Sequence, residues 1–421
     1  MRFLLYDIAT SVVAPFGAAW IAFSPRHRPL LGRFGPHAPL FSDRPVWVHA
    51  CSVGEVGVAK PIIEAMRRRW PEVPVLLTVS TVAGRRIAEA SCRDVPLAWC
   101  PFDHRWIVVR FVRRARPRAL VLVETEVWPN IVRAAGTFGF PVAIVNGRIS
   151  DKHLARYRRY ATWLRPVFSR MTAAGMQNEE HAERIEALGV PRAAVHVTGN
   201  TKFDGVATEV DPSILAGLRA ACGIDAGTPV IVFGSTRPGD EALAAECWKT
   251  LRNDRPDLKC IVAPRHTERS GEAMGAFDEP VLRWSGLKEG RRSGTERVLV
   301  VDVMGELVSL YAMATIAVIG GSFYPGVNGH NPLEPAALGT PTVFGPYMRN
   351  FADPARVLLE AGGARQVSRP EDLPELLRSL MNDPVERAEM GSRARQAVLA
   401  NQGAIARTLD MLDALIEDSS S

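Results

Sequence analysis

Short strand-like runs alternate with helical stretches from Pro45 onward, and this alternation constrains the fold more than any other feature. Five runs rich in β-branched and aliphatic residues are predicted strands: 46–50, 75–80, 119–124, 141–146 and 195–199. Segments with apolar residues three and four apart are predicted helices: 55–69, 82–90, 104–113, 129–138 and 150–168. A series of this kind forms a parallel sheet with helices packed on its faces.

The series pauses between residues 204 and 225 and then begins again. Further strands are predicted at 229–233, 259–263, 298–301, 315–319 and 340–344, and helical stretches follow at 384–400 and 403–416. A chain of 421 residues is long enough for two such domains. We therefore predict an α/β protein with two Rossmann-like parallel-sheet domains, residues 41–210 and 211–421, facing across a cleft. Ligands of such sheets bind beyond the carboxyl ends of the strands, which would lie at this cleft.

Residues 3–23 form an apolar stretch that is long enough to cross a bilayer. Asp7 and Pro15 make it a poor span, whereas the spacing of its apolar residues suits an amphipathic helix in the membrane interface. Three arginines follow between residues 26 and 33, which favours a cytoplasmic location for the protein body. We interpret residues 1–40 as a membrane-anchor helix with a basic flank; a secretory signal peptide and a soluble core helix are the alternatives.

Charge is unevenly divided along the chain. Residues 1–205 hold 29 basic and 16 acidic residues, whereas the remainder holds 22 and 29. A basic first half predicts an anionic partner, such as a phosphorylated substrate, an acidic membrane surface or nucleic acid. The arginine run at 104–118 contains only Trp106 and Phe111 as aromatic residues, which argues against stacking on bases and thus against nucleic acid.

Carboxylates follow two of the predicted strands. Glu55 ends the segment HACSVGE (49–55), where a turn of small residues opens a helix. It is either a helix cap or a general base, and the second role requires that burial raise its pKa. Glu124 and Glu126 follow the strand ending at residue 123, and they could hold sugar hydroxyls, support the base or cap the next helix.

Small-residue loops and an arginine follow strands in the second half. Ser235 and Thr236 lie in a turn that favours phosphate binding by backbone N–H groups, and Arg265 suits bidentate contact with phosphate. The segment 328–335 offers donors for a phosphate and an acceptor for ribose hydroxyls. The six cysteines form no CxxC pair, and neither a Walker motif nor a GxGxxG after the first strand is present. No disulfide framework, metal or cofactor is therefore predicted.

Eight motifs occur in a fixed order along nearly the whole chain. They are HACSVGE at 49–55, ETEVWPN at 124–130, NGRIS at 146–150, GNTKFD at 199–204, GSTRPGDE at 234–241, APRHTER at 263–269, DVMGEL at 302–307 and GHNPLEP at 329–335. This set resembles the 3-deoxy-D-manno-octulosonic acid (Kdo) transferases, glycosyltransferases that build the inner core of lipopolysaccharide. Arg237 stands where the family commonly has His, and Asn328 where it commonly has Gly.

The resemblance implies a GT-B fold and the transfer of Kdo from CMP-Kdo to a hydroxyl of a lipid A precursor (lipid IVA). It implies inversion at the anomeric carbon without a metal. Residues 41–210 would bind the acceptor, and residues 211–421, with their terminal helices, would bind CMP-Kdo. The anchor helix and the basic surface would hold the enzyme on the anionic cytoplasmic face of the inner membrane.

The resemblance also implies roles for individual residues. Glu55 corresponds to the general base, with Glu124, Glu126 and Lys202 supporting the transition state. The expected nucleotide contacts are Ser235, Thr236, Pro264, Arg265, His266, Gly305, Glu306, Leu307, Asn331, Pro332, Leu333 and Glu334. Two alternatives stay open: another GT-B glycosyltransferase or epimerase that uses a UDP-sugar, and a non-catalytic protein that binds acidic lipid.

Overall fold

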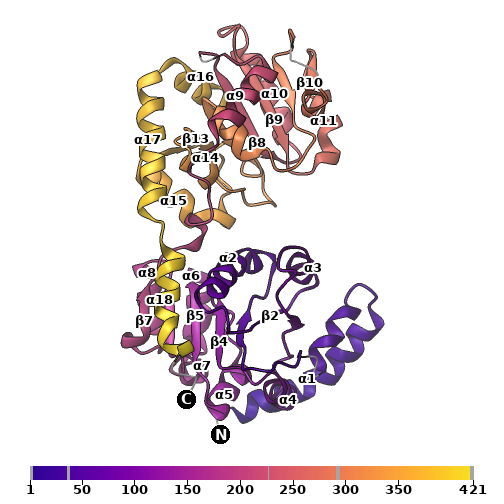
Figure 1. Ribbon diagram of the computed structural model, residues 1–421, viewed down its shortest axis with the longest axis vertical. Coiled ribbons are helices and arrows are strands. Elements are labelled where there is room, and N and C mark those ends of the chain that lie inside the picture. Colours follow the sequence, from indigo (N-terminus) through magenta and orange to yellow (C-terminus); the bar gives the residue numbers. More distant parts are fainter. Residues whose placement is uncertain (1–2, 36–37, 226, 291–293, 418–421) are drawn as a thin grey trace. The chain divides into compact units, whose positions relative to one another are not determined.

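The computed structural model describes residues 3–35, 38–225, 227–290 and 294–417. The chain divides into two compact units: the first runs to Gly205 and includes the residues from Gln402 onward, and the second is Val206–Asn401. Each unit contains a seven-stranded sheet flanked by helices (Figure 1). Because every strand pairs with its neighbours in parallel, the predicted architecture of two parallel-sheet domains is confirmed.

The sheet of the first unit has the strand order β3-β2-β1-β4-β5-β6-β7. Its strands are β1 (Val46–His49), β2 (Val75–Val79), β3 (Leu97–Trp99), β4 (Ala119–Val123), β5 (Val142–Gly147), β6 (Ala173–Met176) and β7 (Val195–Val197). The central strands are continuous apolar runs, as expected where helices bury both faces of a parallel sheet. The order changes direction between β1 and β4, and ligands bind at such reversal points.

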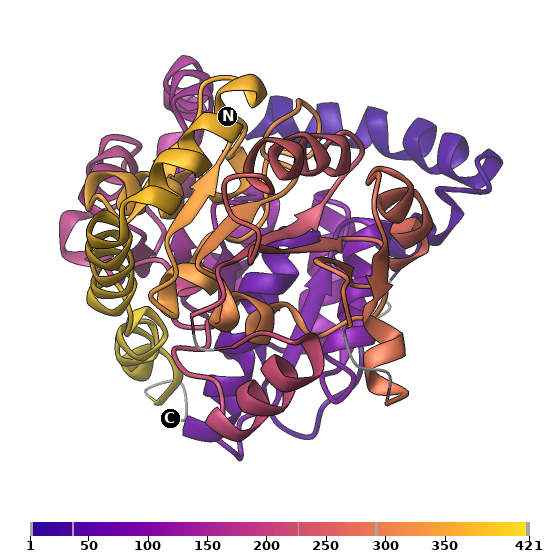
Figure 2. The same ribbon diagram turned by 90° about the horizontal axis from the view of Figure 1, so that it is seen from above.

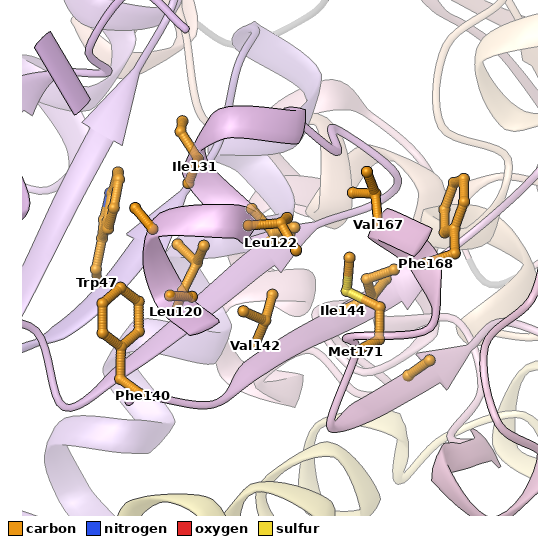
Figure 3. Packing of buried hydrophobic residues seen from close by; sticks show 14 of the residues in the cluster. Trp47, Leu120, Leu122, Ile131, Phe140, Val142, Ile144, Val167, Phe168 and Met171 are labelled. Atoms are coloured by element: carbon orange, nitrogen blue, oxygen red, sulfur yellow. The ribbon is translucent and has the colours of Figure 1, made fainter. Parts of the chain in front are cut away.

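Helices cover both faces of this sheet. They are α2 (Val53–Arg69), α3 (Val82–Ser91), α4 (Arg105–Ala115), α5 (Pro129–Phe138), α6 (Asp151–Arg159), α7 (Ala161–Phe168) and α8 (Glu179–Ala187). Neighbouring side chains of a strand point to opposite faces, so Trp47 packs in one apolar layer while Val46 and Val48 pack in the other. Figure 3 shows the first layer, in which Leu120 and Leu122 of β4 lie close to Trp47 and the residues of α5 and α7.

The last helix, α18 (Ala404–Glu417), packs on the first unit, whereas α17 (Pro384–Ala400) belongs to the second (Figure 1). Leu412 and Ile416 are buried in the layer beneath α2, and Arg69 donates to the Asp413 carboxylate. The predicted boundary, which assigned all residues from 211 to 421 to one domain, is therefore wrong for the final helix. Its apolar face is covered by the first sheet and not by the second.

The sheet of the second unit has the order β10-β11-β9-β8-β12-β13-β14 and reverses between β8 and β12. Its strands are β8 (Val230–Thr236), β9 (Lys259–Pro264), β10 (Val281–Arg283), β11 (Val298–Val300), β12 (Ile316–Ile319), β13 (Thr342–Phe344) and β14 (Ala364–Gln366). Its other helices are α9 (Pro212–Cys222), α10 (Asp240–Leu251), α11 (Ser270–Gly275), α12 (Trp284–Lys288), α13 (Leu307–Met313), α14 (Leu333–Ala337), α15 (Ala352–Glu360) and α16 (Leu373–Asn382).

Helix α1 (Leu4–Phe23) lies at the periphery of the first unit, and none of its residues is buried (Figure 2). By length and composition it is apolar enough to cross a membrane, a test that signal sequences near an N-terminus also pass. Its first turns are tied to the unit: Asp7 pairs with Arg133 of α5 at 2.9 Å, and the Tyr6 hydroxyl donates to Asp103 at 2.7 Å. Toward its end Phe23 is 88% exposed.

Two details of the first unit differ from the sequence prediction. The helix expected over 150–168 is two helices that break at Tyr160, which places Tyr157, Tyr160 and Trp163 around one pocket. The strands β3 and β6 were not predicted. They have three and four residues, too few for a periodic pattern to distinguish them from loops.

Candidate active site

The two strands at the reversal point of the first sheet bring two of the predicted carboxylates together. β1 and β4 are hydrogen-bonded neighbours with His49 opposite Leu122, so the loops that follow them leave the same edge side by side. One oxygen of Glu55, one oxygen of Glu126 and the Cys51 Sγ lie within 4.8 Å of one another. This cluster occupies the position where open α/β sheets bind ligands.

Glu55 lies in the first turn of α2 and is only 7% exposed. Its Oε2 accepts a hydrogen bond from the Cys51 N–H at 2.7 Å, and its Oε1 accepts one from the Ser52 hydroxyl at 2.9 Å. Burial raises the pKa of its carboxyl from 4.5 to about 7; the Cys51 hydrogen bond opposes this rise and the charge of Glu126 adds to it. A carboxyl that titrates near neutral pH is suited to general base catalysis. The contacts of a helix cap are present as well, because both donors precede α2.

Cys51 links Glu55 to Glu126. Burial raises the pKa of Glu126, while a hydrogen bond from the Cys51 thiol lowers it. Burial and the two carboxylates raise the pKa of the thiol itself to about 12, so it stays protonated at neutral pH. The same three groups lie close enough to one another to hold a metal ion, which would take the cysteine as its thiolate. Two carboxyls of raised pKa beside a protonated thiol are also suited to proton transfer.

Glu124 and Lys202 lie at the same edge of the sheet but have other partners. Glu124 has a left-handed backbone (φ 59°), and its carboxylate accepts a hydrogen bond from Arg148 Nε at 2.9 Å. Lys202 lies in a 3₁₀ turn, Thr201–Phe203. The Asn146 side chain, near the end of β5, accepts a hydrogen bond from the Thr201 N–H at 3.0 Å. This bond holds the turn that carries Lys202 beside the end of β5.

An apolar pocket of about 380 Å³ lies beside these carboxylates, and Glu126 is one of its lining residues. The walls come from the start of α1, the loop between β4 and α5, and helices α6 and α7. Tyr157, Tyr160 and Trp163 contribute aromatic rings, and Arg156 contributes a cation. The three-residue spacing of these rings is visible in the sequence, but the face they occupy depends on the break between α6 and α7.

A second pocket, of about 280 Å³, lies at the carboxyl ends of β8, β9 and β11 in the second unit. Most of the expected nucleotide contacts line it: Ser235, Pro264, Arg265, Gly305, Glu306, Leu307 and Glu334. Ser235 and Gly305 have left-handed backbones, with φ of 57° and 92°. Burial raises the pKa of Glu334, while its hydrogen bond with Asn331 and the charge of Arg265 lower it.

The other expected nucleotide residues surround this pocket without lining it. Asn331 binds Glu334 through Nδ2 at 3.2 Å and accepts from the Leu333 N–H at 3.0 Å, which fixes the start of α14. Pro332 precedes that helix and Leu333 is buried in it. Thr236 is buried and donates to Glu241 at 2.9 Å. These residues shape the pocket through the elements they stabilise.

Arg237 lies between two histidines at the same edge. Its Nη1 lies 2.7 Å from His266 Nε2, and its Nε donates to His330 Nε2 at 3.2 Å. Burial, followed by the charge of Arg237, lowers the pKa of His330 to about 4, so His330 is neutral and accepts this bond. His266, an expected nucleotide residue, is thus held by Arg237.

Two polar residues of these sites were not predicted from the sequence. Cys51 was noted only as part of its motif, and its thiol contact with Glu126 requires two distant segments to meet. Asp240 accepts from the N–H groups of Arg237 and Gly321 at 2.8 and 2.6 Å, and so ties the loop after β8 to the loop after β12. Its acidic side chain at the start of α10 is visible in the sequence, but its contact with Gly321 requires two distant loops to meet.

Comparison with known proteins identifies the family. Residues 28–205 match the family model described as 3-deoxy-D-manno-octulosonic-acid transferase (kdotransferase). The 3-deoxy-D-manno-octulosonic acid transferase of Bordetella pertussis is 34% identical, and the alignment covers 94% of this chain and 92% of that protein. The chain belongs to the Kdo transferase family. The Haemophilus influenzae member is 29% identical over 94% of this chain and 93% of its own length. The protein is therefore a glycosyltransferase that transfers Kdo in lipopolysaccharide biosynthesis.

Solved structures resemble the transferase in fold alone. A glycosyltransferase from Rickettsia africae superposes with a TM-score of 0.58 at 10% identity, covering 90% of this chain and 100% of that chain. A UDP-GlcNAc 2-epimerase from Neisseria meningitidis gives 0.56 at 14% identity, covering 88% and 99%. Both likenesses agree with the GT-B fold expected from the sequence.

Proposed function

We propose that this transferase moves Kdo from CMP-Kdo to a hydroxyl of a lipid A precursor, with Glu55 as the general base. The observation that carries this proposal is a buried carboxyl of pKa about 7 at the reversal point of the first sheet, next to a second carboxylate. The acceptor oxygen forms a bond to the anomeric carbon, and CMP leaves with the electron pair of the bond it shared with that carbon. Glu55 takes the hydroxyl proton. A single displacement of this kind inverts the anomeric carbon.

The second unit binds the donor in this proposal. The pocket at the ends of β8, β9 and β11 contains Arg265, a cation suited to a nucleotide phosphate, and its loops present backbone N–H groups. Arg237 adds a cation at the same edge. Positive charge held near the phosphate stabilises the departing CMP, which supports transfer without a metal.

The first unit binds the acceptor at the cytoplasmic face of the inner membrane, with α1 lying in the interface. Asp7 of α1 pairs with Arg133, and Ser11 contacts His104 at 3.0 Å, so the first half of the helix runs along the unit. The apolar side chains of α1 are exposed, among them Phe16 at 73%, and in this proposal they face the membrane interface. A helix held in this way favours interfacial attachment over a full span.

Incubation of the protein with CMP-Kdo and tetra-acylated lipid A precursor tests the proposed function. Mass spectrometry of the lipid product is expected to show the mass of one or more Kdo residues, with release of CMP and inversion of the anomeric configuration. CMP at 100 times its Kd should stabilise the protein by about 2.7 kcal/mol, whereas UDP should give no comparable protection. Protection by UDP alone, with no Kdo transfer, would favour a UDP-sugar enzyme. Acidic-lipid binding without CMP release would favour a non-catalytic protein.

A further inference from the structure

The apolar pocket beside Glu126 combines features that suit one kind of ligand. Its walls are mostly aromatic and aliphatic, and it is shared by α1, the loop after β4, and helices α6 and α7. Tyr160 and Trp163 are 52% and 40% exposed, and residues of these two types concentrate at membrane–water interfaces. Walls of this kind can accept a hydrocarbon chain, with polar groups such as Glu126 and Arg156 at hand for a headgroup.

The pocket is continuous with two other parts of the first unit. Phe3 and Tyr6, at the start of the exposed apolar helix α1, form part of its wall. Glu126 forms another part, and one of its oxygens lies within 4.8 Å of Glu55. A hydrocarbon chain of a ligand that enters beside α1 would therefore reach the proposed catalytic carboxylates.

Cations gather on the helix that forms one wall of the pocket. Lys152, Arg156, Arg158 and Arg159 of α6 are all exposed, and Arg156 lines the pocket itself. The one carboxylate of α6, Asp151, pairs with Arg184 of α8. An amphiphile with an apolar chain and an anionic headgroup complements this arrangement.

We propose that this pocket binds one acyl chain of the acceptor lipid, while the α6 cations contact its phosphates. This inference rests on the proposed function and adds a site of acceptor recognition to it. The bound chain holds the headgroup beside Glu126, so that the acceptor hydroxyl meets Glu55. Acylation of the acceptor is thus recognised by the enzyme itself and is more than a means of holding the acceptor in the membrane.

The test fills the pocket by changing Leu164 of α7, which lines it, to Trp. The matched control is Leu399→Trp, because Leu399 is 44% exposed on α17 of the second unit. Kinetics are measured in the same mixed micelles with a tetra-acylated precursor and with its fully deacylated counterpart, which keeps the phosphorylated disaccharide. For the wild type we expect a KM at least tenfold higher for the deacylated acceptor.

Leu164→Trp is expected to raise the KM for the tetra-acylated acceptor about tenfold while kcat and the KM for CMP-Kdo change less than twofold. Its KM for the deacylated acceptor should match that of the wild type, and Leu399→Trp should change neither. Equal wild-type KM values for the two acceptors, or an equal effect of Leu164→Trp on both, would overturn the inference. Absence of transfer to either acceptor by the wild type would instead contradict the proposed function.

A second measurement does not depend on turnover or on the folding of Leu164→Trp. A precursor with brominated acyl chains should quench tryptophan fluorescence, and an excess of unlabelled tetra-acylated precursor should relieve the quenching. Trp163→Phe keeps an aromatic wall but removes one tryptophan of the pocket. The fraction of fluorescence that unlabelled precursor restores should therefore be smaller in this variant. Quenching that is unchanged by Trp163→Phe would overturn the inference.

Discussion

Replacing Glu55 by Gln should make the protein more stable at pH 8 while removing its proposed base. The folded state holds the Glu55 proton more tightly than the unfolded chain, because burial raises the pKa from 4.5 to about 7. Stability is therefore highest when the carboxyl is protonated, and it falls as pH rises from about 4.5 to about 7. Ionisation of Glu55 at pH 8 destabilises the folded state by about 3 kcal/mol.

Gln has no charge and so removes the destabilisation caused by ionised Glu55. It has only one acceptor oxygen, however, whereas the carboxylate accepts hydrogen bonds on two oxygens, from Cys51 and Ser52. Losing one such hydrogen bond costs about 1 kcal/mol. Glu55→Gln should thus be about 2 kcal/mol more stable than the wild type at pH 8, which is about 5 °C in Tm for a unit of this size. At pH 5 the two proteins should have about equal stability.

Thermal unfolding of both proteins at pH 5 and pH 8, in one detergent, measures this difference. Glu64→Gln is the control on the same helix, because its side chain is 48% exposed and forms an exposed ion pair with Lys60. It should change Tm little at either pH. If Glu55→Gln lowers Tm equally at both pH values, Glu55 is an ordinary helix cap and burial does not raise its pKa.

Three further predictions concern the nucleotide pocket and the metal requirement. Arg265→Gln should weaken CMP binding, measured by calorimetry, by about tenfold or more, whereas Arg283→Gln, at an exposed position, should not. Equal CMP affinities for the wild type and Arg265→Gln would show that Arg265 does not contact the nucleotide. Gly320→Ala should destabilise the protein by about 1–3 kcal/mol, because its Cβ would lie 2.6 Å from the Ser235 carbonyl oxygen. Gly271→Ala meets no atom within 4 Å and should not destabilise; similar Tm values for both variants would contradict the packing. EDTA should leave the transfer rate unchanged, and a loss that divalent cations restore would establish a metal requirement.

The sequence predicted the strands well because most central strands of these sheets are short, continuous apolar runs. Strands β1 and β4 each end one residue before the predicted ends at 50 and 124, and the segments that follow them carry Glu55 and Glu126. Glu55 and Glu126 come together because β1 pairs with β4. The rule that ligands bind where the strand order reverses predicts a site of this kind. The sequence of one strand does not show which strand it pairs with. The raised pKa of Glu55 depends on burial, which a motif cannot show.

Other features depend on contacts between distant segments. Periodicity predicts a helix over 403–416, but it does not tell which sheet covers Leu412 and Ile416. The apolar spacing of residues 3–23 likewise predicts a helix without the pairing of Asp7 and Arg133 that holds it along the unit. The apolar pocket beside Glu126 requires the helix break at Tyr160, and nothing in the local sequence pattern marks that break.

Kdo transfer by Glu55→Gln, measured beside CMP binding by the same preparation, tests the central claim most directly. We predict that kcat falls by about 10²–10⁴ at pH 8, as expected for loss of a general base, while CMP binds with wild-type affinity. Transfer by Glu55→Gln at the wild-type rate would contradict the assignment of Glu55 as the base.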